Sequence, residues 1–206
     1  MNARAAQDLA PPPAAEQANA RRAQWLLGFV ATAVVALTAW TWAGAPPQAL
    51  RTGADFFAEH EAALVNRPLP PFVLRDLAGQ RFELGSLRGK RVFLNLYASW
   101  CPPCREEFPA MLELAASLAQ TQDDFVMVAV SWDEDASELA AFLASLPQPP
   151  KNVLMLSDPG GELTRQLGTR LLPETYFVAV DGTVLARFQN VRDWNDEAYA
   201  RYFRAD

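Results

Sequence analysis

The stretch YASWCPPCREEFP, Tyr97 to Pro109, holds both cysteines of the 206-residue chain. The apolar run RVFLNLYA before it predicts a buried β-strand, and EEFPAMLELAASLAQ after it has helical periodicity. Cys101 and Cys104 therefore stand where a strand gives way to a helix, and Pro102 and Pro103 suit the first helical turn. Free N–H groups and the helix dipole at such a place favour a thiolate, which lowers a thiol pKa from about 8.5 to roughly 3.5 to 7.5.

Two cysteines at this spacing can bind metal, attach haem or cycle between dithiol and disulfide. Tetrahedral zinc needs four ligands, and the chain offers two cysteines and the distant His60. Haem attachment needs a histidine directly after the second cysteine, where Arg105 stands, and a copper site of the cysteine-plus-histidine kind lacks its histidine too. A purely structural disulfide would close too short a loop to stabilise the fold much.

Redox exchange is therefore the favoured interpretation of the pair. We expect Cys101 to be the exposed attacking thiol and Cys104 the resolving thiol that releases the partner. No metal and no cofactor besides this redox-active disulfide is expected.

The rest of the chain alternates strand and helix patterns. Strands or hairpins are predicted at residues 72–84, 125–132, 152–158 and 175–188, and helices at 137–146, 161–168 and 193–203. This order predicts an α/β fold whose sheet has a parallel core covered by helices on both faces.

An uncharged apolar segment, WLLGFVATAVVALTAWTW, runs from Trp25 to Trp42. Its length and its terminal tryptophans predict a membrane span, although Ala43-Gly44-Ala45 leaves a cleaved signal peptide as the alternative. Arg21 and Arg22 before the span place the N-terminus in the cytoplasm and the rest of the chain outside, on the periplasmic side in a bacterium.

The predicted organisation has four parts. They are a cytoplasmic disordered tail (1–22), a transmembrane signal-anchor helix in contact with membrane lipid (23–43), a linker in which His60 is solvated (44–68), and the folded domain (69–206). The formal net charge of -6 argues against a nucleic-acid partner.

Two motifs, LNLYASWCPPCREEFP (94–109) and LPETYFVAVDG (172–182), together resemble the thioredoxin-like family of membrane-tethered thiol-disulfide oxidoreductases, the TlpA, ResA and CcmG (DsbE) group. The resemblance covers about Leu69 to Asp206. It implies a thioredoxin fold, in which a mixed central sheet is flanked by helices and carries an N-terminal β-hairpin extension, preceded by one transmembrane helix. It also implies Cys101 as nucleophile, Cys104 as its partner, and a cis peptide before Pro173 facing the active site; the alternative for Leu172-Pro173 is an ordinary trans loop.

The resemblance also points to acidic and polar residues around the pair. Asn95 stands where cytoplasmic thioredoxins carry a buried aspartate, as is usual in the tethered group. Glu107 matches an acidic residue three positions after the second cysteine, and we expect it to tune Cys104. Its position at the edge of the apolar helical stripe agrees, and a solvated surface charge is the alternative, as expected for Glu106.

The client-binding residues implied are Trp100, Pro102, Pro103, Leu172 and Glu174. Glu174 matches the Pro-Glu-Thr of the CcmG type, which is read as acidic selectivity beside the substrate groove; an exposed glutamate at a strand start is the alternative. Trp100 flanks Cys101, where it can shield the thiol or pack against the sheet.

By resemblance, the function is that of a periplasm-facing thiol-disulfide oxidoreductase. Its clients would be exported proteins with a CxxC disulfide, such as apocytochrome c during cytochrome c maturation, and its electron donor a membrane thiol reductant of the CcdA or DsbD kind. Alternatives are a reductant of a copper-delivery protein, a general thiol oxidant and, in another class, a redox-inert tethered binding module. The residues alone do not decide the direction of electron flow.

Overall fold

The computed structural model describes residues 53–205. The tail, the membrane span and the first part of the linker predicted for residues 1–52 lie outside the described residues. Among residues 53–205, no helix combines the length and the apolar character that crossing a bilayer requires.

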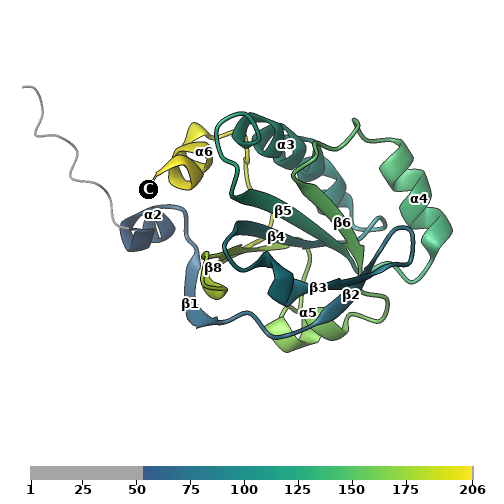
Figure 1. The fold of residues 1–206 in the computed structure, drawn as a ribbon. Coiled ribbons are helices and arrows are strands. Elements are labelled where there is room, and N and C mark those ends of the chain that lie inside the picture. Colours follow the sequence, from purple (N-terminus) through teal and green to yellow (C-terminus); the bar gives the residue numbers. More distant parts are fainter. Residues whose placement is uncertain (1–52, 206) are drawn as a thin grey trace, which may run out of the picture. The chain divides into compact units, whose positions relative to one another are not determined.

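The helices and strands follow one another along the chain as Figure 1 shows. They are α2 (Gly53–Glu59), β1 (Ala63–Pro68), β2 (Val73–Asp76), β3 (Arg81–Glu83), the 3-10 helix η1 (Leu84–Leu87), β4 (Arg91–Tyr97), α3 (Pro102–Leu118), β5 (Phe125–Ser131), α4 (Ala136–Ala144), β6 (Val153–Ser157), α5 (Glu162–Leu167), β7 (Glu174–Val178), β8 (Thr183–Gln189) and α6 (Glu197–Arg204).

One mixed sheet organises these elements, in the order β1-β8-β7-β4-β5-β6-β2-β3. Its centre is parallel, because β5 pairs in parallel with both β4 and β6. The strand β7 pairs antiparallel with β4, and β8 with β7. The predicted N-terminal hairpin is confirmed as β2 and β3, which joins the sheet through β6.

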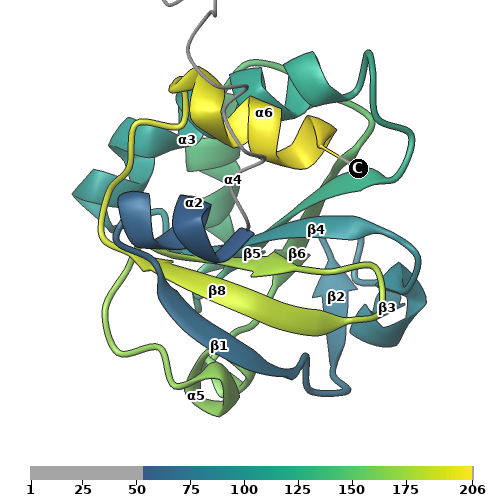
Figure 2. The same ribbon diagram turned by 90° about the vertical axis from the view of Figure 1, so that its left-hand side faces the viewer.

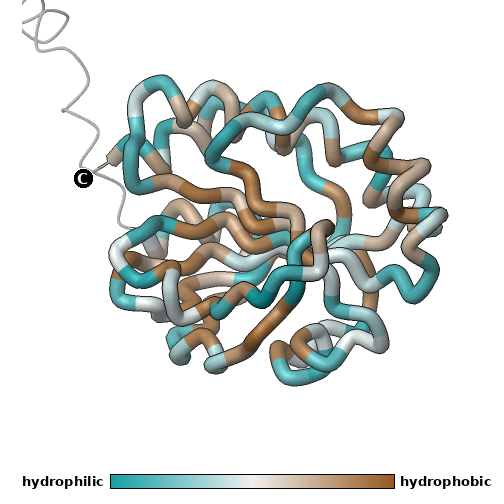
Figure 3. The backbone as a smooth tube through the Cα atoms, turned by 45° about the vertical axis from the view of Figure 1, so that its right-hand side comes forward, coloured by the Kyte–Doolittle hydropathy of each residue, from teal (hydrophilic) through white to brown (hydrophobic). Residues whose placement is uncertain are grey.

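Helices cover both faces of the sheet (Figure 2). The larger apolar cluster lies between the sheet and α2, α3, α4 and α6, and the smaller one lies against η1 and α5. Along β4 the side chains alternate between them: Phe93 belongs to the first cluster and Leu94 to the second. In Figure 3 the hydrophobic stretches accordingly gather in the interior, and the hydrophilic ones lie on loops and outer helix turns.

The segment before residue 69 departs from the prediction. The strand β1 pairs antiparallel with β8 at one edge of the sheet. In α2, Phe56 and Phe57 are buried, and Phe56 stacks on Phe177 with ring centroids 6.5 Å apart. His60 is half-buried and stacks on Phe56 at 4.3 Å. The predicted boundary at residue 69 and the solvated His60 are therefore wrong, because burying two adjacent phenylalanines joins residues 53–68 to the domain.

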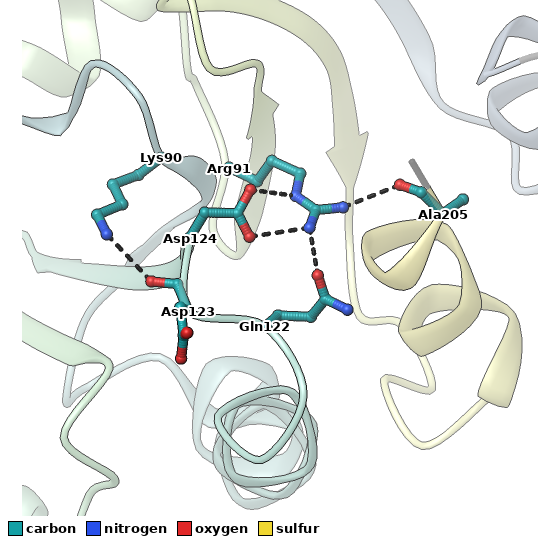
Figure 4. A network of polar contacts seen from close by, with 6 residues as sticks. All are labelled: Lys90, Arg91, Gln122, Asp123, Asp124 and Ala205. Atoms are coloured by element: carbon teal, nitrogen blue, oxygen red, sulfur yellow. Dashed lines mark hydrogen bonds and ion pairs between the residues drawn. The ribbon is translucent and has the colours of Figure 1, made fainter.

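A polar network fixes the start of β4 (Figure 4). The Arg91 guanidinium donates to both carboxylate oxygens of Asp124, at 2.9 and 2.8 Å, to Gln122 Oε1, and to the Ala205 carbonyl at 2.9 Å. The hydrogen bond from Arg91 is the main reason why the pKa of Asp124 is lowered. The network ties the start of β4 to the α3–β5 loop and to the residue that follows α6.

Candidate active site

The two cysteines lie at the N-terminus of α3, as predicted. Cys101 is the N-cap of the helix, and its Sγ accepts a hydrogen bond from the Cys104 backbone N at 3.3 Å. The two residues form a disulfide with their Cα atoms 5.3 Å apart. Pro102 and Pro103 occupy the first helical turn, where a missing N–H leaves no hydrogen bond unmade.

The expectation of an exposed Cys101 is wrong for this oxidised form. Cys101 is only 4% exposed and Cys104 is fully buried, because both pack into the larger apolar cluster. Cys101 is still the more accessible of the two cysteines, as predicted, since it alone of the pair retains any contact with solvent.

The tryptophan before the disulfide does not pack against the sheet. Trp100 is 58% exposed, and its ring lies 6.4 Å from that of Trp132 in the loop after β5. Pro102 is also exposed and Pro103 is half-buried. This end of the domain therefore presents an aromatic side chain beside the redox pair.

Glu107 is buried, so the surface-charge alternative is wrong. It is 2% exposed, and its carboxylate accepts hydrogen bonds from Asn95 Nδ2 at 3.3 Å, Trp194 Nε1 at 3.1 Å and the Arg192 backbone N at 3.2 Å. Burial raises the pKa of Glu107 to about 7, against the lowering effect of these donors. Glu107 lies one turn after Cys104, and residues three apart share a face of a helix.

The peptide bond between Leu172 and Pro173 is cis, as the resemblance implies. Pro173 is buried, Leu172 is half-buried, and Leu171 before them is 75% exposed. The next residue, Glu174, pairs with Leu96 near the end of β4. Pro173 therefore lies at the same end of the sheet as the turn that carries Cys101.

The redoxin family model matches residues 64–202, which is most of the chain. The chain belongs to the redoxin family. Because it has its Cys101–Cys104 pair in a CxxC arrangement and is similar in sequence to thiol-disulfide oxidoreductases, this redoxin is a thiol-disulfide oxidoreductase.

Relatives of this redoxin are similar in sequence and in fold. It is 34% identical over 142 residues to the thiol:disulfide interchange protein DsbE of Yersinia pestis, covering 68% of this chain and 70% of that one. It is 30% identical over 130 residues to the thiol-disulfide oxidoreductase ResA of Bacillus cereus, covering 63% and 72%. The solved structure of a Chlorobium tepidum protein assigned as DsbE superposes with a TM-score of 0.58 at 30% identity, covering 68% and 95%.

Glu174 differs from both sequence interpretations. It is 1% exposed, so it is not an exposed residue at a strand start. Its carboxylate accepts hydrogen bonds from the Tyr176 hydroxyl at 2.8 Å and from Gln189 Nε2 at 3.0 Å, and Arg187 Nε lies 3.5 Å away. Neighbours along a strand point to opposite faces, and Thr175 contacts Asn95 on the α3 side, so Glu174 points to the α5 side. Its side chain is therefore bonded within the domain, and its part in client selectivity stays a prediction.

Two hydrogen-bond donors to Glu107 were not predicted from the sequence. Trp194 and the Arg192 backbone N lie in the loop between β8 and α6, more than 80 residues further along the chain. The helix predicted from residue 193 begins only at Glu197, so Trp194 precedes it and is free to turn inward. A tryptophan within a charged stretch was the only available signal.

Proposed function

We propose that this redoxin is a periplasm-facing reductant of CxxC disulfides in exported proteins, with apocytochrome c during cytochrome c maturation as its client. The observation that supports this direction is Glu107, a buried carboxylate one turn from Cys104 whose hydrogen-bond donors among residues 53–205 are all uncharged. A negative charge there opposes a thiolate in the reduced pair. A pair whose reduced form is disfavoured gives up its electrons readily, which is the opposite of the strong oxidant DsbA.

The exchange begins with the reduced pair. The Cys101 thiolate attacks one sulfur of the client disulfide, and the other client sulfur leaves as a thiolate. Cys104 then passes its proton to the Glu107 carboxylate and attacks the Cys101 sulfur of the mixed disulfide. Both client sulfurs leave as thiolates and take up protons from solvent to give the dithiol, while Cys101 and Cys104 form their disulfide; two electrons have passed to the client.

A pKa of about 7 suits Glu107 to this proton transfer, because a base works best when its pKa is near the working pH. The exposed Trp100 and Pro102, with Leu172 across the end of the sheet, supply the surface for the client segment. Electrons return from a membrane thiol reductant of the CcdA or DsbD kind, and the apolar segment of residues 23–43 holds the domain at the membrane.

The test uses a synthetic peptide with an oxidised CxxCH segment. We expect the reduced chain to reduce this peptide at least tenfold faster than oxidised insulin, and the Cys104→Ala variant to accumulate a mixed disulfide with the peptide. Equal rates for the two substrates would contradict the proposal that apocytochrome c is the client. Net oxidation of the reduced peptide by the disulfide form would contradict the direction.

A further inference from the structure

The loop that follows β5 grips the turn that carries Cys101. The Trp132 backbone N donates to the Tyr97 carbonyl at 2.8 Å. One residue further, the Asp133 carboxylate accepts hydrogen bonds from the Ser99 backbone N, at 3.1 and 2.9 Å, and from the Ser99 hydroxyl. Two consecutive residues of this loop thus hold the chain between the end of β4 and the start of α3.

Asp133 is buried among neutral hydrogen-bond donors. It is 4% exposed, and its remaining partner is the Ser131 hydroxyl, at 2.5 Å. Within residues 53–205, no lysine, arginine or histidine forms an ion pair with it. Burying a carboxylate among neutral donors costs folding free energy. Its place next to the turn that carries Cys101 suggests that this cost is offset by a function at the redox pair.

Ser99 is also held from its other side. Its carbonyl accepts a hydrogen bond from Arg105 Nη1 at 3.2 Å, and the Arg105 guanidinium lies 4.8 Å from the centre of the Phe142 ring. The Cys101 backbone N donates to the Ala98 carbonyl at 3.2 Å. The turn is therefore fixed at successive residues, and Cys101 follows Ser99 by only two positions.

We propose that Asp133 is a positioning residue for the redox pair: through Ser99 it holds Cys101 against Cys104 and favours their disulfide over the dithiol. Two effects act in the same direction. A fixed turn keeps the two sulfur atoms close, and the negative charge behind the turn opposes a thiolate at Cys101. The inference rests on the proposed reductant function, because it identifies a second group that makes the pair easy to oxidise.

The full chain, kept in detergent micelles, is equilibrated with dithiothreitol at pH 7, and the fraction of free thiol is measured. In this exchange the protein disulfide takes up two electrons and two protons, and dithiothreitol becomes a cyclic disulfide. We expect Asp133→Asn to shift the equilibrium about tenfold toward the protein dithiol, which is about 30 mV for a two-electron couple. Ser99→Ala keeps the backbone donor and should shift it less.

Asp158→Asn is the matched control. Asp158 is 2% exposed, follows β6 as Asp133 follows β5, and accepts hydrogen bonds from backbone N atoms and the hydroxyl of Thr164 at the start of α5. Its substitution should lower the unfolding temperature and leave the redox equilibrium unchanged. If Asp133→Asn behaved like Asp158→Asn, the proposal would be wrong; should Asp133→Asn fail to fold, an unchanged equilibrium in Ser99→Ala would overturn it equally.

The same measurement separates this inference from the proposed function. A wild-type potential near about -120 mV, the DsbA end of the scale, would contradict the reductant function. The difference between wild type and Asp133→Asn would still decide the role of Asp133.

Discussion

Two glutamates lie equally deep on the two sides of one sheet and have different partners. Glu107 faces α3 and receives hydrogen bonds from an amide side chain, an indole and a backbone N–H. Glu174 faces α5, is bonded by a tyrosine hydroxyl and an amide side chain, and has Arg187 Nε at 3.5 Å. A cation beside a buried carboxylate offsets part of the cost of burying its charge. At Glu107, burial outweighs the neutral donors and raises the pKa. Burial alone therefore does not identify a proton-transfer group; Glu107 is singled out by its place one turn from Cys104 together with its raised pKa.

The largest expected effect on stability comes from Glu174. Glu174→Gln removes the charge that faces Arg187 and one acceptor site in the network with Tyr176 and Gln189. We expect a loss of about 4 kcal/mol in the free energy of unfolding, the range for breaking an ion pair around a buried charge, measured by denaturant titration. The reduction potential should stay at the wild-type value. A large shift in potential with little loss of stability would reverse the roles assigned to the two glutamates.

Whereas Glu174→Gln should lower the free energy of unfolding, Glu107→Gln should raise it at neutral and higher pH. The folded pKa of about 7 lies above the ordinary value of 4.5, so the native state binds the extra proton between these pH values. The stability that this proton contributes is present below pH 4.5 and is lost as pH rises through 7. Relative to wild type, Glu107→Gln should therefore gain about 3 kcal/mol between pH 4.5 and 8. Parallel stability curves for the two proteins would refute the raised pKa.

A smaller effect is expected at Trp194, whose Nε1 donates to Glu107. Trp194→Phe removes a hydrogen bond to the charged form, so the pKa of Glu107 should rise further, by about one unit, which is about 1.4 kcal/mol. The carboxyl carbon signal of Glu107 in an NMR titration measures it. The control is Trp132→Phe. Trp132 lies near Trp100 and not near Glu107, so this change should leave the Glu107 signal unchanged.

The smallest effect is expected at the surface. The pKa of Asp124 is lowered chiefly by its hydrogen bond from Arg91, so its contribution to stability is present above the unfolded pKa and is lost as pH falls through the lower folded value. This pH dependence is opposite in sign to that of Glu107. Asp124→Asn should cost less than about 1 kcal/mol and less still at high salt, as seen in thermal unfolding. A loss as large as that for Glu174→Gln would remove the distinction between buried and exposed pairs.

The sequence predicted the elements of the domain well because their signals are local. Strong apolar runs predict β4 and β5, and the cysteine pair predicts the start of α3. Residues 53–68 were misassigned because neither α2 nor the edge strand β1 has a strong pattern of its own. What places them is the packing of Phe56 and Phe57 on residues more than 100 positions away.

At the site, the residues predicted the redox-active cysteines, whereas Glu107 as their partner and the cis bond before Pro173 followed from the family resemblance that two short motifs carry. The sequence could not predict Trp194 as a partner of Glu107, since the contact spans 87 positions and depends on where a loop turns. It could not predict the burial of Glu174, because the alternating faces of a strand do not say which neighbours cover each face. The grip of Asp133 on Ser99 likewise depends on the parallel pairing of β4 and β5, which brings their two ends together.

The reduction potential of the wild-type chain and of Glu107→Gln at pH 7, equilibrated against dithiothreitol, tests the central claim most directly. We predict a wild-type value below about -230 mV and a less negative value for Glu107→Gln, because loss of the negative charge stabilises the reduced pair relative to the disulfide. A wild-type value near about -120 mV, or identical values for the two proteins, would contradict the account.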